Sequence, residues 1–171
     1  MKIAICSDVH LEFGPITLEN DDGADVLVLS GDICTAKDLE VTDGIMSSGK
    51  TERFLEFFAT CSKNFPHVVY VMGNHEHYHR DFATSIHTLK AALKPYENIH
   101  VLDKEVWDHN DYRFIGGTLW TDMNKQDPMT IYHIRDRMND FRTVKNSNRK
   151  VTHKVPIYKK DAEGNFVYKN V

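Results

Sequence analysis

The chain has 171 residues, of which 41% are hydrophobic and 27% are charged, and its formal net charge is −4. This length suits one domain with its own core and excludes two of ordinary size. No apolar stretch approaches the roughly 20 residues of a membrane-spanning helix, and no basic-then-apolar leader precedes the first apolar segment. Cys6, Cys34 and Cys61 are odd in number and widely spaced, unlike a disulfide framework. We therefore expect a soluble, cytoplasmic protein without a membrane partner.

Three short apolar segments, at residues 2–6, 25–30 and 67–72, are rich in Val and Ile and are predicted to be buried β-strands. Each is followed by a polar cluster. The clusters are Asp8-Val9-His10, Gly31-Asp32 and Gly73-Asn74-His75-Glu76. In open α/β sheets the carboxyl ends of neighbouring strands meet at one edge, so the three clusters are predicted to converge there.

The segments between and after these strands predict an α/β fold. Apolar side chains at helical spacing predict a helix over residues 51–65 and a second from residue 82, with Asp81 as its N-cap and Pro95 as its stop. Alternating strands and helices are typical of βαβ units with parallel pairing. Three further short strands are expected to begin a second sheet, and a weak helical pattern follows them. They cover residues 99–102, 105–107 and 112–116, and the helical pattern covers residues 129–141.

The polar clusters contain residues that bind divalent metal ions. Asp8 and His10 are two residues apart, so in an extended segment they face the same side and bind one cation together. Asp32 follows Gly31, which permits a tight turn and a close approach, so its carboxylate can lie between two cations. Asn74 adds a neutral oxygen. This set of oxygen and nitrogen donors suits Mn²⁺, Fe or Zn²⁺ and disfavours a thiolate site.

The expected chemistry is the hydrolysis of a phosphate ester, a monoester or a diester. Two divalent metal ions roughly 3.5–4 Å apart activate a shared water and stabilise the charge of an in-line displacement. His75 is the candidate catalytic residue, because beside the ligand Asn74 it either protonates the leaving oxygen or stabilises charge on the phosphoryl group. Glu76 is a candidate supporting residue that orients His75.

Taken singly, each cluster has a simpler explanation. One Asp after a strand is more often a turn or helix-capping residue than a ligand. Three clusters of ligand type after three consecutive predicted strands rarely arise from turn chemistry alone. His77 and His79 extend the histidine pattern, and we favour exposed loop residues over further ligands. Cys34 is expected to be a small packing residue.

In this order the clusters resemble the calcineurin-like metallophosphoesterase superfamily. Its pattern runs Asp-x-His, Gly-Asp-x-x-Asp, Gly-Asn-His-Asp/Glu, a lone His and Gly-His-x-His, and the first three blocks are present here. The resemblance implies an α/β fold, a mixed β-sheet sandwich flanked by helices. It also implies site roles: Asp8 and His10 at the first metal ion, Asp32 between both ions, Asn74 at the second ion, and His75 beside the leaving group.

Two departures from that pattern concern the metal ligands. Thr35 stands where the second Asp of Gly-Asp-x-x-Asp would be, and no Gly-His-x-His occurs. Neither His133 nor His153 follows an apolar strand, as the lone His of the superfamily does. We therefore expect a metallophosphoesterase core over residues 1–145 that is incomplete at its C-terminus, with a missing C-terminal segment or a partner chain supplying the remaining ligands.

Residues 146–171 are predicted to form a basic β-hairpin of the same domain. From residue 142 onward, eight Lys or Arg residues face two acidic residues. Exposed lysine residues commonly prevent a sheet edge from pairing with another chain. We favour this explanation of the positive charge over binding of nucleic acid. The leading hypothesis is a metallophosphoesterase. The alternatives are a non-catalytic remnant or scaffold with at most one weak metal site, and a nuclease whose cleavage weakens steeply with salt.

Overall fold

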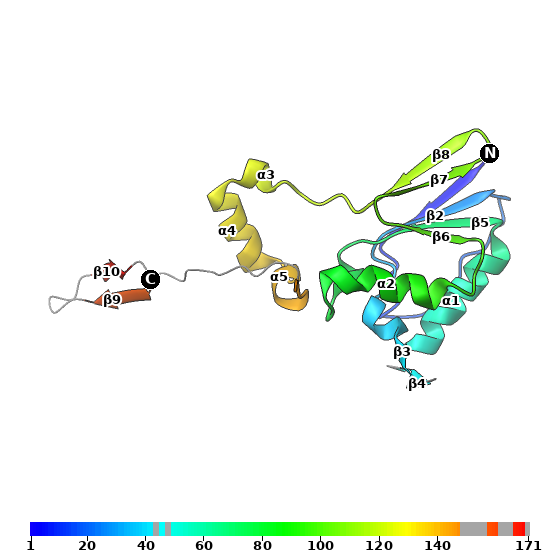
Figure 1. The fold of residues 1–171 in the computed structure, drawn as a ribbon. Helices are drawn as coiled ribbons and strands as arrows, with labels where there is room; N and C mark the ends of the chain where they lie inside the picture. The colour runs from blue at the N-terminus through cyan, green and yellow to red at the C-terminus, as the bar shows by residue number, and fades with distance from the viewer. Residues whose placement is uncertain (43–44, 47–48, 148–156, 161–165, 170–171) are drawn as a thin grey trace.

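The computed structural model describes the chain except residues 43–44, 47–48, 148–156, 161–165 and 170–171. At its centre lies a parallel sheet in the strand order β1-β2-β5-β6 (Figure 1). The strands are β1 (Ile3–Cys6), β2 (Val26–Ser30), β5 (His67–Val71) and β6 (Ile99–Leu102). In register, Val26 of β2 pairs with Ile3 on one side and with His67 on the other. The α/β fold class is confirmed.

Two helices, α1 (Thr51–Asn64) and α2 (Phe82–Leu93), lie together against one face of this sheet (Figure 1). Both lie where the helical spacing predicts them. Asp81 caps α2, since its carboxylate accepts a hydrogen bond of 2.9 Å from the backbone N–H of Ala83. Each helix is a crossover that returns the chain to the start of the next parallel strand.

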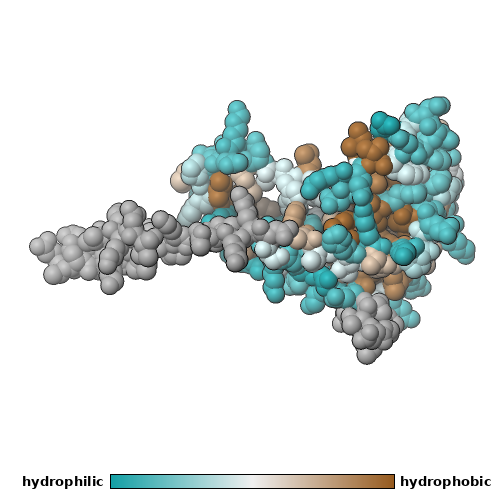
Figure 2. All heavy atoms as spheres, in the orientation of Figure 1, coloured by the Kyte–Doolittle hydropathy of each residue, from teal (hydrophilic) through white to brown (hydrophobic). Residues whose placement is uncertain are grey.

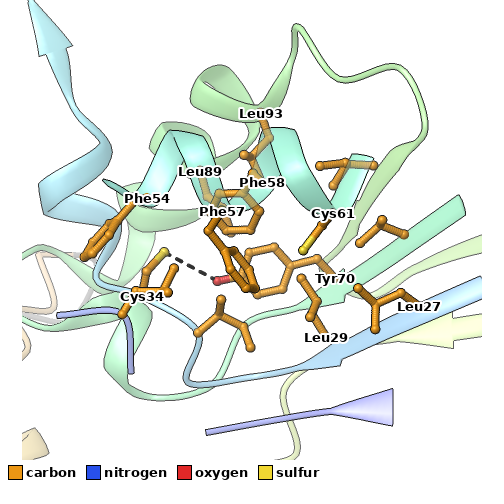
Figure 3. Close-up of a cluster of buried hydrophobic side chains, with 14 of the residues drawn as sticks. Leu27, Leu29, Cys34, Phe54, Phe57, Phe58, Cys61, Tyr70, Leu89 and Leu93 are labelled. Atoms are coloured by element: carbon orange, nitrogen blue, oxygen red, sulfur yellow. Dashed lines mark hydrogen bonds between the residues drawn. The ribbon is translucent and has the colours of Figure 1, made fainter. Parts of the chain in front are cut away.

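The core between these helices and the sheet holds the strands in place (Figure 3). The side chains of α1 and α2 pack onto Leu27 and Leu29 of β2 and onto Tyr70 of β5. The rings of Phe58 and Tyr70 are stacked, with centroids 5.6 Å apart. Cys34 is buried in this cluster as a packing residue, as expected, and all three cysteines are free. The ends of β2 and β5, where the polar clusters begin, are therefore anchored by a large apolar cluster.

Two expectations about the strands are wrong. β1 is an edge strand, with Ile5 73% exposed, because a short apolar run does not distinguish an edge strand from a central one. Likewise β6 joins the first sheet instead of beginning a second, since α2 returns it parallel to β5. β7 (Glu105–His109) and β8 (Tyr112–Gly116) do form a separate antiparallel pair.

The remaining elements are short. They are η1 (Ala36–Leu39), β3 (Val41–Thr42), β4 (Ile45–Met46), η2 (His75–His77), α3 (Met123–Gln126), α4 (Pro128–Arg137), α5 (Asp140–Thr143), β9 (Ile157–Lys160) and β10 (Phe166–Lys169). β9 and β10 pair antiparallel, and the turn expected between them lies outside the described residues. The division of the domain at residue 145 stays a prediction.

The surface seen from the same side is largely hydrophilic, with hydrophobic side chains gathered over the sheet (Figure 2). Several large apolar residues are exposed, including Phe13, Ile115 and Leu119. Within the described ranges, none of the helices combines the length and apolarity required to cross a membrane.

Candidate metal centre

The loops that follow β1 and β2 stay hydrogen-bonded to each other beyond the ends of the strands. The backbone N–H of Asp8 donates to the carbonyl of Gly31 at 3.0 Å, and that of His10 donates to the carbonyl of Asp32 at 3.0 Å. The loop after β5 lies against the loop after β2, because a Cβ built on Gly31 would be 2.9 Å from Gly73 Cα. The three polar clusters therefore meet at one edge of the sheet.

Three of the predicted ligands have a backbone conformation that residues other than glycine rarely adopt. Asp8, His10 and Asp32 have φ angles of 54°, 48° and 55°, in the left-handed region. Each such residue costs on the order of 1–3 kcal/mol and persists only where the surrounding structure imposes it. Positive φ also occurs in other turns of the described chain, such as Lys104 and Asn110, so what distinguishes these three residues is that they lie in the loops where the polar clusters meet.

The side chains of His10, Asp32 and His75 come together at this edge. Each offers one ligand atom, and these three atoms lie within 4.8 Å of one another. The backbone N–H of His75 donates to Asp32 Oδ1 at 3.0 Å, and the rings of His10 and His75 meet edge to face at 4.3 Å. His75 therefore lies among the predicted ligands, where it can act either on a substrate or as a ligand itself.

Glu12 is a site residue that the sequence reasoning missed. Its Oε1 lies 2.8 Å from His75 Nδ1 and 3.2 Å from His10 Nδ1. An ionised carboxylate only accepts hydrogen bonds, so Nδ1 of each imidazole is the donor to Glu12, and Nε2 is the ring nitrogen left to bind a metal ion or a substrate. The signal was present in the sequence, since Glu12 continues the two-residue spacing of Asp8 and His10.

The environment of Glu12 favours its ionised form. Burial by itself raises the pKa of the Glu12 carboxyl, but hydrogen bonds from its own backbone N–H, from His75 and from His10 lower the pKa below 4.5. Glu12 Oε2 is buried and has no hydrogen-bond partner in the described part of the chain. A buried anionic oxygen without a donor is costly, and a nearby cation would offset that cost.

Glu76 supports the loop of Asp32 and makes no hydrogen bond to the ring of His75 among the described residues. Its Oε1 accepts from the backbone N–H of Ile33 at 2.8 Å and from the Tyr70 hydroxyl at 2.7 Å. Its Oε2 accepts from the backbone N–H groups of Gly73 at 2.8 Å and Asp32 at 3.2 Å. The fully buried carboxylate thus ties the loop after β2 to the loop after β5.

A cavity of about 490 Å³ opens at this edge of the sheet. Asp8, Asp32 and Asn74 line it, and Asp32 also belongs to the cluster with His10 and His75, so it connects that cluster to the cavity. The loop of residues 117–120 also lines the cavity and is held by a 2.6 Å hydrogen bond from Thr118 Oγ1 to the carbonyl of Met72. Cavities of roughly 300–1,000 Å³ are usual for small-molecule sites.

The two further histidines of the loop differ from each other. His79 is exposed, as expected, but His77 is only 2% exposed, and its ring is stacked on Phe82 with centroids 4.5 Å apart. The prediction of an exposed loop residue is therefore wrong for His77. The short 3₁₀ turn η2 replaces the alternation of an extended segment and turns His77 inward.

Gly73→Ala is expected to disturb Asp32 directly. A Cβ at this position would overlap Asp32 Oδ1 and lie 2.7 Å from the Asp32 backbone nitrogen, so the carboxylate must move. We expect binding of Mn²⁺, measured by calorimetric titration, to weaken at least about tenfold. Gly14→Ala is the control, since nothing lies within 4 Å of its added Cβ. Equal Mn²⁺ affinity of the two variants would contradict the placement of Asp32.

Comparison of the sequence with known proteins identifies a family. The sequence profile of the calcineurin-like phosphoesterases matches residues 1–156. An uncharacterized protein, L509, of Acanthamoeba polyphaga mimivirus is 30% identical over 103 residues, which cover 57% of this chain and 36% of that protein. The chain thus spans about a third of the length of this curated relative.

A solved structure shows the same fold. It is the crystal structure of a phosphopantetheinyl hydrolase from Mycobacterium tuberculosis, with a TM-score of 0.58 and 13% sequence identity over 88% of this chain and 57% of that one. At this identity the likeness concerns the fold alone. The profile match, which covers most of the chain, decides the family. The chain belongs to the calcineurin-like phosphoesterase family.

Proposed function

We propose that this protein is a metal-dependent phosphoesterase that hydrolyses a phosphomonoester or phosphodiester with a metal-activated water. The observation that carries the proposal is the convergence of the three polar clusters at the rim of one cavity. Asp8, His10 and Asp32 have left-handed backbone conformations in the two loops that bring these clusters together.

The residues present fit divalent metal ions. Asp8 and His10 would hold one ion, Asn74 would hold the other, and Asp32 would contact both. Two features favour a cation here: the contact of Glu12 with Nδ1 of His10, which leaves Nε2 of that ring as the possible metal ligand, and the unpartnered buried oxygen of Glu12 itself. Bound divalent ions lower the pKa of a coordinated water and neutralise charge on phosphoryl oxygens.

The side chains of the chain have separate tasks in this proposal. Glu12 accepts hydrogen bonds from Nδ1 of both His10 and His75 and so fixes the orientation of the two rings. His75, when it is protonated, donates from Nε2 to the leaving oxygen, and the carboxylate of Glu12 stabilises the imidazolium. Residues 117–120 line the cavity and would contact the substrate there.

The ligand set of the second ion needs further donors. The sequence contains no Gly-His-x-His, and His133 is exposed on α4, while His153 lies outside the described residues. We propose that additional ligands come from a longer form of the protein or from a partner chain. The three free cysteines agree with a reducing, cytoplasmic compartment.

The test is turnover of two generic substrates by the full chain. Protein stripped with EDTA is supplied with Mn²⁺, Fe²⁺ or Zn²⁺, and the release of nitrophenol from p-nitrophenyl phosphate and from bis(p-nitrophenyl) phosphate is measured together with the bound metal. We expect bound metal and metal-dependent turnover of at least one substrate. Neither metal nor turnover would favour a non-catalytic scaffold. Cleavage of single-stranded DNA that falls steeply with salt would favour the nuclease.

A further inference from the structure

The segment that contains α5 docks beside the loop of the candidate metal centre, although more than sixty residues separate them in the sequence. Four hydrogen bonds with backbone donors join residues 143–147 to residues 79–82. They run from His79 N to Thr143 O at 3.0 Å, from Lys145 N to Arg80 O at 2.9 Å, from Phe82 N to Lys145 O at 2.7 Å, and from Ser147 N to Asp81 Oδ2 at 2.8 Å. This docking fixes α5 against the turn that carries His75.

The docked segment brings Asp140 to the cavity of the metal centre. Asp140, the first residue of α5, lines the same cavity as Asp8, Asp32 and Asn74. Its Oδ2 accepts a hydrogen bond of 3.3 Å from the hydroxyl of Tyr78. Its Oδ1 is buried and has no partner among the described residues. A further carboxylate therefore lies at this site, and only one of its two oxygens accepts a hydrogen bond among the described residues.

The hydroxyl of Tyr78 connects Asp140 to Asn74. Asn74 Nδ2 lies 3.4 Å from Tyr78 Oη, the same oxygen that donates to Asp140. A phenol has one proton, and a carboxylate can only accept, so the proton of Tyr78 is directed to Asp140. Tyr78 Oη is then left as an acceptor for the amide N–H of Asn74. The amide nitrogen of Asn74 is thereby assigned to Tyr78, and its carbonyl oxygen is free to face the cavity.

Tyr78 also contacts the other candidate site residue on this turn. Its ring is stacked on the ring of His75, with centroids 4.1 Å apart and planes 22° from parallel. Tyr78 thus holds the two consecutive residues Asn74 and His75 by different means, a hydrogen bond and a stacked ring. Removal of a residue that hydrogen-bonds to a metal ligand and orients it typically lowers metal affinity by about 10–100-fold.

We propose that Asp140 and Tyr78 are positioning residues of the metal centre: Asp140 orients the hydroxyl of Tyr78, and Tyr78 in turn aims the carbonyl oxygen of Asn74 at the metal ion. This inference rests on the proposed function, because it assigns Asn74 to an ion. It extends the site to a segment of the chain that none of the three sequence clusters includes.

A double-mutant cycle on the full chain tests the relay. Binding of Mn²⁺ is titrated calorimetrically in the wild type, Tyr78→Phe, Asp140→Ala and the double variant. Tyr78→Phe removes the hydroxyl and keeps the ring that is stacked on His75. We expect each single variant to weaken Mn²⁺ binding about tenfold and the double variant to be no weaker than either, because both changes break one relay. Asp136→Ala, an exposed acid on α4, controls for the loss of charge.

The other outcomes overturn the inference. Unchanged affinity in Tyr78→Phe, or additive losses in the double variant, would show that there is no relay. A much larger loss in Asp140→Ala than in Tyr78→Phe would make Asp140 a direct ligand instead. Asp32→Asn in the same titrations separates a failure of the proposed metal site from a failure of the relay. If Asp32→Asn loses Mn²⁺ while Tyr78→Phe does not, only the relay fails. If the wild type binds no Mn²⁺, the proposed function and the relay both fail. Thermal unfolding in EDTA shows whether each variant keeps its fold.

Discussion

Asp32→Asn is expected to reduce metal-dependent turnover to background and to remove bound metal, whereas His75→Ala is expected to retain metal and to slow turnover by about 10²–10⁴-fold. Asp32 is the predicted bridge between two ions, and an amide in its place keeps the shape but loses the charge. The amide oxygen can still accept from the backbone N–H of His75, so the loop itself should be preserved. Bound metal is measured on the purified variants, and turnover is measured with the two aryl phosphates.

The position of His75 makes this comparison decisive. His75 contributes a ligand atom to the same cluster as His10 and Asp32, so its location is compatible with both roles. A residue that only protonates the leaving oxygen can be removed without loss of metal. If His75→Ala loses metal as Asp32→Asn does, His75 is a ligand and its catalytic assignment is wrong. His79→Ala, an exposed histidine four residues along the same loop, is the matched control.

The fold was predictable from the sequence to the extent that it depends on local periodicity. α1, α2 and the strands β2, β5 and β6 lie within one or two residues of the predicted positions, because their apolar spacing and boundary residues are local signals. The sheet to which β6 belongs was not predictable, since apolar runs of similar length serve a central strand, an edge strand or a second sheet equally well.

Much of the candidate site was also predictable, since each cluster follows a strand and parallel strands end at one edge. The residues that hold the candidate ligands in place were not predictable. Tyr78 and Asp140 are 62 residues apart, and only the docking of α5 brings them together. Glu76 was predicted to orient its neighbour His75, yet the 3₁₀ turn directs its carboxylate to the backbone of Asp32. The sequence does not show this direction, because it depends on the short turn that changes the direction of successive side chains.

The support of Asp32 explains how a strained loop is maintained. Asp32 has a left-handed backbone, and its N–H and that of Ile33 both donate to the buried carboxylate of Glu76. The same carboxylate accepts from Gly73 at the start of the next loop. One side chain thus satisfies the backbone donors of two loops that have left regular β-structure, so the energetic cost of this loop geometry is offset by hydrogen bonds within the loops themselves.

Glu76→Ala is therefore expected to destabilise the protein by about 3 kcal/mol or more, since buried donors without an acceptor cost roughly 1–3 kcal/mol each. The variant would leave three backbone N–H groups and the Tyr70 hydroxyl without their acceptor. Urea denaturation in EDTA measures the free energy of unfolding without a contribution from bound metal. Glu56→Ala, at an exposed position of α1, is the matched control and should change stability little.

Comparison of the wild type with Glu76→Ala at different pH values also reports on the ionisation of Glu76. Burial raises the pKa of this carboxyl above 4.5, although hydrogen bonds from Tyr70, Ile33 and Gly73 act in the opposite direction. The folded state then holds the proton more tightly than the unfolded state does. The stability that this group contributes is complete below pH 4.5 and declines as the pH rises through the raised pKa. The difference in unfolding free energy between wild type and Glu76→Ala should shrink over that range, and a difference that grows with pH would show that the four donors outweigh burial.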